Sequence, residues 1–419
     1  MDIAMDSKQD KKKETRLCPK WLYRFGVNLM YLYMKLFFGL KLDRSGLKDV
    51  KGPFLVVANH QSLFDFGIVS KAALPEQLRF VISSHFFHNS LYNKLFRFIG
   101  AISKRQFVPD TVSARKTLRL AKQGCSICIF PEGQTCYSGE NAAIDPNIGK
   151  LAKLLHLPVV NVQIRGNYLR RPKWARGKTY PSKVEAKAYL LLSAEQVDSM
   201  SPEELGTAII KGISYDEFVW QKKKMYRSKN PRSAEGLESL IFLCPKCRKE
   251  FTMKPNGNHL TCSHCGYDVV LNDYCLFEKG NSGDLIEDTI SGWIRLESKY
   301  IREKLDNNEL LPITSHGRYL ESDLGDYDEF GYHYYGEGTG TLDENGFTFI
   351  GTRAGEPYEY HVDPYQMWDL THNADLASIS LNGNCVGDKD YAFDPDDPRL
   401  MMKYVLAWPP IRDKYFPNA

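Results

Sequence analysis

A histidine and an aspartate follow a buried apolar run near the start of the sequence. Residues 59–65 read Asn-His-Gln-Ser-Leu-Phe-Asp directly after the run Phe-Leu-Val-Val-Ala at 54–58, so His60 and Asp65 lie where a predicted strand gives way to a helix. An imidazole takes up a proton near neutral pH, and a carboxylate on its second nitrogen fixes its tautomer. The pair can therefore act as a general base toward a substrate that carries its own hydroxyl. The alternative interpretation is that Ser62 and Asp65 only open a helix.

Three further blocks follow the histidine block along the chain. Residues 98–105 read Phe-Ile-Gly-Ala-Ile-Ser-Lys-Arg, residues 127–133 read Ile-Cys-Ile-Phe-Pro-Glu-Gly, and residues 157–162 read Leu-Pro-Val-Val-Asn-Val. The last two blocks contain predicted buried strands. In order and spacing, the four blocks together resemble the glycerolipid acyltransferase family typified by lysophosphatidic acid acyltransferase, over about residues 20–215.

This resemblance implies roles for individual residues and for the whole chain. By position, His60 and Asp65 are the catalytic pair, and Arg105, Glu132 and Gly133 bind the acceptor. The implied protein is a membrane-associated O-acyltransferase, which moves a fatty acyl group from a thioester of coenzyme A or acyl carrier protein to the hydroxyl of a lysoglycerophospholipid. The acceptor implied first is 1-acylglycerol-3-phosphate, which would give phosphatidic acid.

The third block departs from the family pattern after its glycine. The family usually reads Glu-Gly-Thr-Arg-Ser, whereas this chain reads Glu-Gly-Gln-Thr-Cys at 132–136, so Thr135 stands in the place of the arginine. A threonine hydroxyl cannot replace the charged, bidentate pairing of a guanidinium with phosphate. We therefore expect Arg105, together with Arg170 and Arg171, to hold the phosphate of the acceptor. A non-phosphorylated alcohol or a glycolipid stays open as the alternative acceptor.

Two features close to these blocks leave further alternatives open. A basic cluster at 165–187 directly follows the fourth block, where it can reach a phosphorylated head group or an acidic acyl carrier, or simply keep a loop solvated. Cys136 lies close in sequence to the third block. An acyl-cysteine intermediate therefore stays open beside direct transfer of the acyl group.

The elements predicted around the blocks alternate between strands and helices. A strand is predicted at 78–83, and helices are predicted at 89–99, 111–122 and 148–155. This alternation predicts an α/β domain whose central, mostly parallel sheet is flanked by helices. Such a sheet carries its ligand site at the strand ends, which is where the blocks fall.

Residues 21–42 are the most apolar stretch and are rich in aromatic side chains. Arg24, Asn28 and Lys35 interrupt the stretch, so it is a poor candidate for a membrane-spanning helix. Aromatic and basic residues together favour a segment in the interface of an anionic membrane, and a core helix is the alternative. No signal peptide is evident, so we expect a peripheral or monotopic protein on the cytoplasmic side of the cell membrane.

Four cysteines carry a strong metal-binding pattern. Cys244 and Cys247 form one Cys-x-x-Cys pair, and Cys262 and Cys265 form a second pair after fourteen intervening residues. Two such pairs supply four thiolates for a tetrahedral zinc ion, and a site closed by four protein ligands is structural. The segment resembles a zinc ribbon. A disulfide framework is the weaker alternative, because the chain shows no export signal.

Charge is distributed unevenly along the chain. The net charge is +4, but residues 284–399 carry −17 and the remainder carries +21. The basic part suits an anionic partner, either acidic lipid or nucleic acid. A zinc-ribbon nucleic-acid-binding protein is therefore the competing hypothesis, which we disfavour because the ribbon is only mildly basic and lacks an aromatic stripe for base stacking. A catalytically dead lipid-binding scaffold is a third hypothesis, and the presence of both His60 and Asp65 argues against it.

The last third of the chain has a different pattern. From residue 317 onward short strands and turns follow one another, and a helix is predicted at 399–406. Antiparallel strands followed by one helix resemble a small β-barrel of the pleckstrin-homology or GRAM type. We therefore expect four segments: a membrane-interface helical segment at 1–50, an acyltransferase domain at 51–235, a zinc ribbon at 236–280 and a β-rich domain at 281–419.

Overall fold

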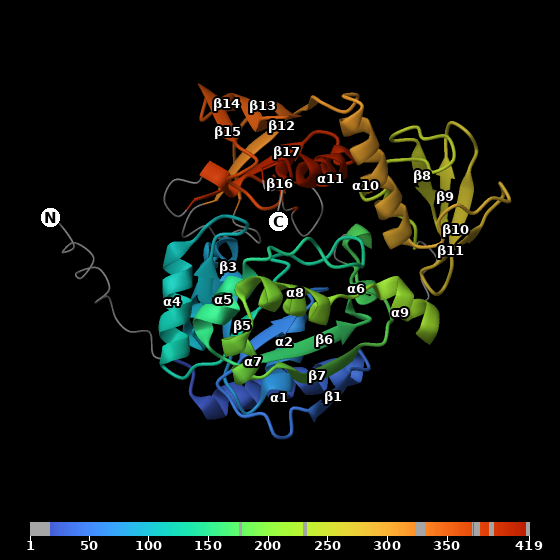
Figure 1. Cartoon of the computed structure of the whole chain (residues 1–419). Helices are drawn as coiled ribbons and strands as arrows, with labels where there is room; N and C mark the ends of the chain where they lie inside the picture. The colour runs from blue at the N-terminus through green and yellow to red at the C-terminus, as the bar shows by residue number, and fades with distance from the viewer. Residues whose placement is uncertain are drawn as a thin grey trace.

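A seven-stranded sheet forms the centre of the N-terminal half of the chain. The computed structural model describes residues 17–175, 178–228, 233–322, 332–370, 372, 378–384 and 389–415. The strands of this sheet are β1 (Lys41–Gly46), β2 (Leu55–Ala58), β3 (Arg79–Ser83), β4 (Ile102–Lys104), β5 (Ile127–Ile129), β6 (Val159–Arg165) and β7 (Glu185–Leu192). Their order is β1-β7-β6-β2-β5-β3-β4 (Figure 1). Strands β6, β2, β5, β3 and β4 are parallel to one another, while β7 and β1 run in the opposite direction.

Helices cover both faces of this sheet because its central strands are apolar on both sides. Successive side chains of a strand point to opposite faces. Val56 and Ala58 of β2 accordingly lie in one buried cluster with residues of α1 and α2, and Leu55 and Val57 lie in another with residues of α4, α5, α7 and α8. The helices are α1 (Lys20–Phe37), α2 (Asp65–Ala73), α3 (Ser90–Ile99), α4 (Thr111–Lys122), α5 (Ile148–Leu155), α6 (Asn167–Arg170), α7 (Ala194–Ser199), α8 (Pro202–Ile213) and α9 (Glu217–Lys224). The predicted α/β class, with a mostly parallel sheet between helices, is confirmed.

Local sequence signals set the ends of these helices. The Asn89 side chain accepts hydrogen bonds from the backbone N–H groups of Leu91 and Tyr92, and thereby begins α3. Gly100 ends the same helix with a φ of 76°, a left-handed conformation that glycine adopts without a steric penalty. The Asp110 side chain caps α4 through the Ser113 N–H. The helices predicted at 111–122 and 148–155 therefore coincide with α4 and α5.

A small antiparallel sheet follows the first half. It consists of β8 (Met253–Asn256), β9 (His259–Cys262), β10 (Asp268–Leu271) and β11 (Phe277–Lys279), in the order β11-β10-β9-β8. In Figure 1 this sheet lies beside the long helix α10 (Ile290–Asp306). The cysteine pairs belong to this unit, as the ribbon hypothesis requires.

The C-terminal region is a six-stranded antiparallel sheet with a terminal helix. Its strands are β12 (Ile313–Ser322), β13 (His333–Asp343), β14 (Gly346–Arg353), β15 (Glu356–Val362), β16 (Ile379–Ser380) and β17 (Asp390–Pro395), and the helix is α11 (Leu400–Arg412). The order is β15-β14-β13-β12-β17-β16, which places β15 and β16 at opposite edges among the described residues. The β-rich region and its final helix are confirmed. Closure into a barrel is not, since the two-residue strand β16 pairs only with β17 in this order.

One buried cluster joins the three parts of the molecule. It contains Tyr168 and Trp174 from the first half, Phe242 beside the ribbon, Trp293 of α10 and Trp408 of α11. These large side chains are almost completely buried, so their packing fixes the C-terminal sheet above the first sheet, as Figure 1 shows.

The N-terminal segment contains both a helix and a strand. Residues 1–16 of the segment expected at 1–50 lie outside the described residues. Helix α1 packs on α2, while β1, which falls within the same segment, pairs in parallel with β7 of the central sheet. Among the helices that the structure describes, none combines the length and the apolar character that crossing a membrane requires.

Candidate active site

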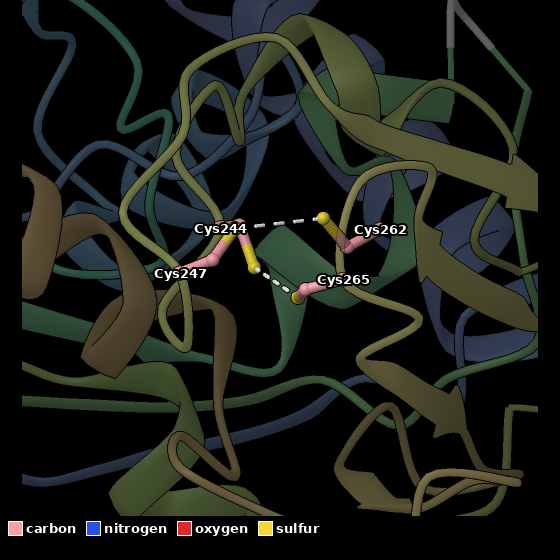
Figure 2. Close-up of side chains that lie close together, drawn as sticks. All are labelled: Cys244, Cys247, Cys262 and Cys265. Carbon is pink, nitrogen blue, oxygen red and sulfur yellow. Dashed lines mark hydrogen bonds between the residues drawn. The ribbon is translucent and has the colours of Figure 1, made fainter.

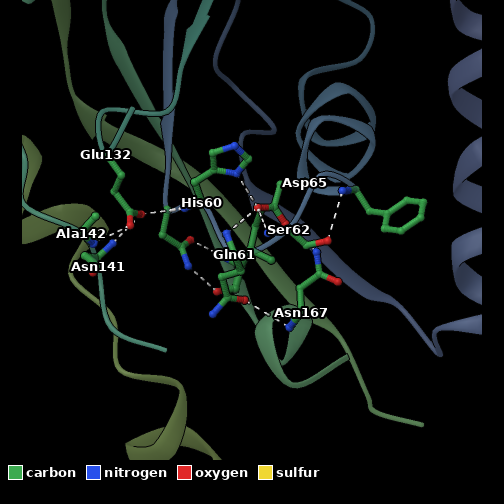
Figure 3. A network of polar contacts seen from close by, with 11 residues as sticks. His60, Gln61, Ser62, Asp65, Glu132, Asn141, Ala142 and Asn167 are labelled. Carbon is green, nitrogen blue, oxygen red and sulfur yellow. Dashed lines mark hydrogen bonds and ion pairs between the residues drawn. The ribbon is translucent and has the colours of Figure 1, made fainter. Parts of the chain in front are cut away.

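Three loops meet at one edge of the central sheet and bring the candidate residues together. His60 follows β2, Glu132 follows β5 and Asn167 follows β6, and these three strands are adjacent and parallel. The carboxyl ends of parallel strands lie at the same edge, which is where α/β sheets carry their ligands. Residues more than 100 positions apart therefore converge on one site (Figure 3).

The predicted histidine–aspartate pair is formed. His60 Nδ1 lies 2.9 Å from Asp65 Oδ2, a hydrogen-bonding distance. The Asp65 side chain is fully buried, whereas the His60 side chain is 18% exposed. The bond to Nδ1 leaves Nε2 as the ring nitrogen available to a substrate, and His60 lines a large cavity. The geometry is that of an oriented general base.

Asp65 is held by several donors in addition to the imidazole. Its Oδ2 atom accepts hydrogen bonds from the backbone N–H groups of Gln61 at 2.6 Å and Ser62 at 2.8 Å. Its Oδ1 atom accepts one from Asn167 Nδ2 at 2.6 Å (Figure 3). Asp65 does begin α2, but the N-cap position is Phe64, which makes no side-chain cap. The carboxylate thus binds both the preceding turn and the imidazole. The alternative interpretation, in which Asp65 only opens a helix, does not account for these contacts.

Glu132 holds the backbone of His60. Its Oε1 atom accepts the His60 N–H at 2.7 Å and Asn141 Nδ2 at 2.8 Å, while Oε2 accepts the Ala142 N–H at 2.8 Å. Burial raises the pKa of Glu132 to about 8, and these hydrogen bonds oppose the shift. The Glu132 carboxyl therefore positions the main chain of His60 (Figure 3).

A second buried carboxyl group, Glu217, ties the loops together. It accepts hydrogen bonds from the Gly166 N–H at 2.9 Å, from Gln61 Nε2 at 2.9 Å and from the Tyr215 hydroxyl at 2.7 Å. The Gln61 side chain in turn accepts the Asn167 N–H at 3.1 Å. Burial raises the pKa of Glu217. The loops after β2 and β6 are thus joined to α9 by a continuous buried network.

The cavity that His60 lines is large and mostly apolar. Its volume is about 1970 Å³. Side chains from α1, from α3 and from the third block line it, and the C-terminal region contributes Trp368 and His372. The Trp368 N–H donates to the Phe107 carbonyl at 2.8 Å, which joins that region to the loop after β4. An apolar cavity of this size beside a general base can hold a hydrocarbon chain.

The predicted acceptor-binding arginines have different surroundings. Arg171 lines the cavity together with Lys104 and Lys173, whereas neither Arg105 nor Arg170 belongs to the described lining. The Arg170 guanidinium lies 4.0 Å from the centre of the Phe38 ring and donates to the Tyr180 carbonyl at 3.2 Å.

The turn after β5 forms part of the cavity wall. Gly133 lines the cavity with a φ of +67°, and a Cβ atom there would approach the Phe107 ring at 3.1 Å. Both the backbone conformation and the close ring favour glycine at this position. Thr135 also lines the cavity, while the buried Gln134 donates to Asp369 Oδ2 at 3.0 Å. The C-terminal region therefore contacts the segment that departs from the family pattern.

Cys136 is poorly placed to act as a nucleophile. Its side chain is buried and does not belong to the described lining of the cavity. Burial raises the pKa of Cys136 well above its usual value, and the nearby carboxyl groups of Glu132, Glu217 and Asp65 raise it further. The thiolate, which is the nucleophilic form, is therefore strongly disfavoured.

The four predicted metal ligands form one cluster. Cys244 Sγ lies 3.7 Å from Cys265 Sγ, and Cys247 Sγ lies 3.8 Å from Cys262 Sγ. All four sulfurs lie within 4.8 Å of one another (Figure 2). A Zn–S bond of about 2.3 Å in a tetrahedron gives sulfur–sulfur separations of about 3.8 Å. The cluster therefore fits a tetrahedral metal ion without a large rearrangement.

Sequence reasoning missed Gln61, Asn141, Asn167 and Glu217 as parts of the site. Only Asn167 carried a usable signal, because a polar residue follows Gly166 directly at the end of β6. The others contribute through long-range pairing that no local pattern reports.

Comparisons with known proteins relate part of this chain to acyltransferases. Residues 41–165 match the family model described as Acyltransferase. A probable 1-acyl-sn-glycerol-3-phosphate acyltransferase of Mycoplasma genitalium is 28% identical over 162 residues, which cover 37% of this chain and 56% of that protein. The 1-acyl-sn-glycerol-3-phosphate acyltransferase of Bacillus subtilis is 20% identical over 157 residues, which cover 38% of this chain and 78% of that protein. The crystal structure of the 1-acyl-sn-glycerophosphate (LPA) acyltransferase PlsC from Thermotoga maritima aligns with a TM-score of 0.40 and 20% identity, over 50% of this chain and 84% of that one.

Proposed function

We propose that this chain, which carries an acyltransferase domain at residues 41–165, transfers a fatty acyl group from a thioester to the hydroxyl of a lysoglycerolipid. The observation that carries the proposal is the 2.9 Å contact between His60 Nδ1 and the buried Asp65 Oδ2 at the edge of an apolar cavity. The pair supplies a general base, and the cavity offers room for hydrocarbon. The names of the two curated relatives support the same class of reaction.

The transfer needs only His60 as the proton carrier. Nε2 takes the proton of the acceptor hydroxyl while the oxygen attacks the thioester carbonyl, and Asp65 stabilises the imidazolium that forms. The tetrahedral adduct then collapses, the carbon–sulfur bond breaks, and the imidazolium returns the proton to the departing thiolate. The products are an ester and a thiol. The raised pKa of Cys136 favours this direct route over an acyl-cysteine intermediate.

The proposed acceptor is 1-acylglycerol-3-phosphate. Because Thr135 carries no charge, other cations must bind the phosphate, and we assign this role first to Arg171, which lines the cavity beside Lys104. Arg105, Glu132 and Gly133 remain acceptor-site residues in this proposal, with Glu132 acting through the backbone of His60.

The phosphate assignment is tested by comparing the two neighbouring arginines. Charge-assisted hydrogen bonds contribute about 1.5 to 3 kcal/mol, so Arg171→Ala raises the KM for the phosphorylated acceptor roughly ten- to a hundredfold. The KM for the thioester stays constant. Arg170→Ala is the matched control, because this guanidinium packs on the Phe38 ring, and Arg105→Ala tests the remaining candidate. Unchanged KM values in Arg171→Ala and Arg105→Ala, with equal use of a lysolipid that lacks phosphate, would instead favour the non-phosphorylated or glycolipid acceptor.

The acyl donor is a thioester of coenzyme A or of acyl carrier protein. Lys104 and Lys173 also line the cavity, so its lining suits either anionic donor. Supplying the two thioesters separately at equal concentration distinguishes them, since the preferred carrier gives the higher kcat/KM.

We further propose that the protein lies on the cytoplasmic side of the cell membrane, in the interface of anionic lipid. Helix α1 buries Tyr23, Val27 and Met34 and leaves a row of large apolar side chains exposed. Further exposed apolar side chains lie on α3 and at the start of α2. The exposed side chains are Trp21, Phe25, Leu29, Leu32, Leu36, Leu63, Phe66, Leu91 and Leu95. Many exposed apolar side chains with basic neighbours are typical of interfacial binding.

Flotation with acidic liposomes tests whether α1 binds the membrane. Leu29→Glu and Leu32→Glu together should release most of the protein, while Val112→Glu on α4, an even more exposed apolar position on the other side of the sheet, should not. High salt should release part of the wild-type protein, because the basic contribution is screened. Equal flotation of both variants would contradict the assignment of α1 as the membrane-binding element.

The four cysteines are proposed to bind a structural zinc ion. Cys244, Cys247, Cys262 and Cys265 supply four thiolates, which leave no position for a substrate. Cys262→Ser should reduce the bound zinc by one equivalent per chain. It should unfold the ribbon and have a smaller effect on the rate of acyl transfer. A chelator that stops turnover at once without any structural change would identify a catalytic metal instead.

The decisive experiment is an acylation assay with purified full-length protein. A radiolabelled acyl thioester is supplied with a panel of lysolipids, with and without a phosphate, and the products are separated by chromatography. We expect a labelled product with at least one lysolipid, and its formation to require His60. No product with any acceptor from either thioester, in protein that is folded by circular dichroism, would refute the function.

A further inference from the structure

A second group of metal-ligating side chains lies between the first half of the chain and the C-terminal sheet. His85 and His88 belong to the segment after β3, where Ser84–Phe87 form a short 3-10 helix, η1. Such a helix has three residues per turn, so side chains three positions apart lie on the same side. Asp390, the first residue of β17, comes from the other half of the molecule.

One ligand atom from each of these three residues lies within 4.8 Å of the other two. His88 and Asp390 are almost completely buried, with His88 Nδ1 3.7 Å from Asp390 Oδ2. His85 Nδ1 is buried without a hydrogen-bond partner in the described part of the chain. A buried polar atom in this state costs free energy, and a bound ligand would remove that cost.

The spacing of the pair differs from that of three other histidine–aspartate pairs in the same protein. His60–Asp65, His156–Asp198 and His316–Asp396 have nitrogen–oxygen distances of 2.9, 2.7 and 2.8 Å, which are direct hydrogen bonds. The 3.7 Å between His88 and Asp390 is too long for such a bond. It is close to the separation of about 3.4 Å between two ligands that bind one zinc ion at about 2.0 to 2.1 Å.

The surroundings hold the three side chains in place. Ser322 lies directly opposite Asp390 in the β12–β17 ladder, and its hydroxyl is hydrogen-bonded to His88 Nδ1, a contact that the ion would replace. The Ser84 hydroxyl lies 3.3 Å from both oxygens of the Asp390 carboxylate. The His85 ring stacks on Tyr332, with the ring centres 4.7 Å apart. Partners of this kind orient the ligands in protein metal sites.

We propose that His85, His88 and Asp390 bind a divalent transition-metal ion, which links η1 to the C-terminal sheet. Two imidazoles and one carboxylate are a ligand set for Zn²⁺ and for Fe²⁺, and they leave at least one position for a water molecule or the Ser322 hydroxyl. His85 and Tyr332 also line the large cavity, so the ion fixes part of the wall beside the candidate active site.

Zinc stoichiometry in the full-length protein tests this proposal. Protein stripped with a mild chelator and then titrated with Zn²⁺ should bind two equivalents, one at the four cysteines and a weaker one at this site. His88→Gln and Asp390→Asn should each bind one equivalent, with at least a hundredfold weaker affinity for the second ion. His156→Gln is the matched control, because it removes an exposed histidine that is paired with an aspartate and should retain both equivalents.

Two further measurements keep the test decisive if one of these variants fails to fold. His85→Gln removes a ligand whose Nδ1 has no other partner in the described residues, so it should lose the second ion while the metal-free protein still unfolds in one cooperative transition. In wild-type protein, a second equivalent of Co²⁺ should add visible d–d absorption without further thiolate charge-transfer absorption. Saturation of the wild-type protein at one equivalent, or an unchanged second equivalent in all three variants, would overturn the proposal.

Discussion

Two histidine–aspartate pairs in this protein have similar geometry and different surroundings. The nitrogen–oxygen distance is 2.9 Å in His60–Asp65 and 2.7 Å in His156–Asp198. The side chains of the first pair are 18% and 0% exposed, and those of the second are 65% and 56% exposed. A short contact between an imidazole and a carboxylate is therefore not sufficient to identify a catalytic pair.

The difference lies in what surrounds the carboxylate. Asp65 is buried and accepts hydrogen bonds from two backbone N–H groups and from Asn167, so its orientation toward His60 is fixed. Water competes for the exposed pair and salt screens it, so such pairs contribute about 0 to 1 kcal/mol. Burial of the acid and a cavity beside the base are the features that distinguish the candidate site.

Replacing the two histidines gives the largest expected contrast. His60→Ala should reduce acyl transfer by about a thousandfold or more, since it removes the proton carrier. His156→Ala should leave turnover within about twofold of wild type, because surface substitutions have small effects. Both rates are measured with a saturating thioester, and circular dichroism checks the fold. Near-wild-type turnover in His60→Ala would remove the basis of the proposed mechanism.

Replacing the two aspartates tests orientation separately from proton transfer. Asp65→Asn should lower kcat by roughly a hundred- to a thousandfold, because an amide can donate to Nδ1 and thereby select the wrong tautomer. Asp198→Asn is the exposed counterpart and should have no measurable effect on kcat. If the two substitutions behave alike, the buried carboxylate is not what orients His60.

Removing one support of Asp65 should have a smaller effect. Asn167→Ala deletes the donor to Asp65 Oδ1 and leaves the backbone donors in place. A hydrogen bond to a charged group contributes about 1.5 to 3 kcal/mol, so we expect kcat to fall roughly ten- to a hundredfold. Because Asn167 acts through Asp65, the pH dependence of kcat should shift while the KM for both substrates stays constant. A rise in KM with an unchanged pH profile would indicate contact with substrate instead.

The smallest expected effect is the coupling free energy within the exposed pair. A double-mutant cycle with His156→Ala and Asp198→Ala, followed by urea unfolding, should give about 0.2 to 1 kcal/mol. The value should decrease in high salt. A salt-independent coupling well above this range would show that exposure does not explain the difference between the two pairs.

The sequence predicted the local parts of the structure better than the contacts between them. Helices α4 and α5 match their predicted bounds, because apolar periodicity and, for α4, the Asp110 cap act within a few residues. His60, Asp65 and the four cysteines could be identified because each set has a short, chemically specific spacing. The catalytic and acceptor-binding roles taken from the family resemblance stay predictions until the variants are measured.

Contacts between distant segments could not be read in the same way. The bond from Asn167 to Asp65 spans 102 positions and that from Gln61 to Glu217 spans 156, and hydrophobic patterns do not report which loop ends meet. The predicted boundaries at 235/236 and 280/281 also stay predictions. One buried cluster runs across both of them, so composition alone does not divide this core.

The contribution of Trp368 and His372 to the cavity wall has a consequence during synthesis of the chain. These residues follow Thr207, the last lining residue of the first half, by about 160 positions, and ribosomes add about 5 to 20 residues per second, so they emerge roughly 8 to 33 seconds after it. During that interval the nascent first half exposes the unlined edge of an apolar cavity. Chaperones that recognise hydrophobic segments can bind such a surface. It stays exposed until the C-terminal sheet folds over the cavity.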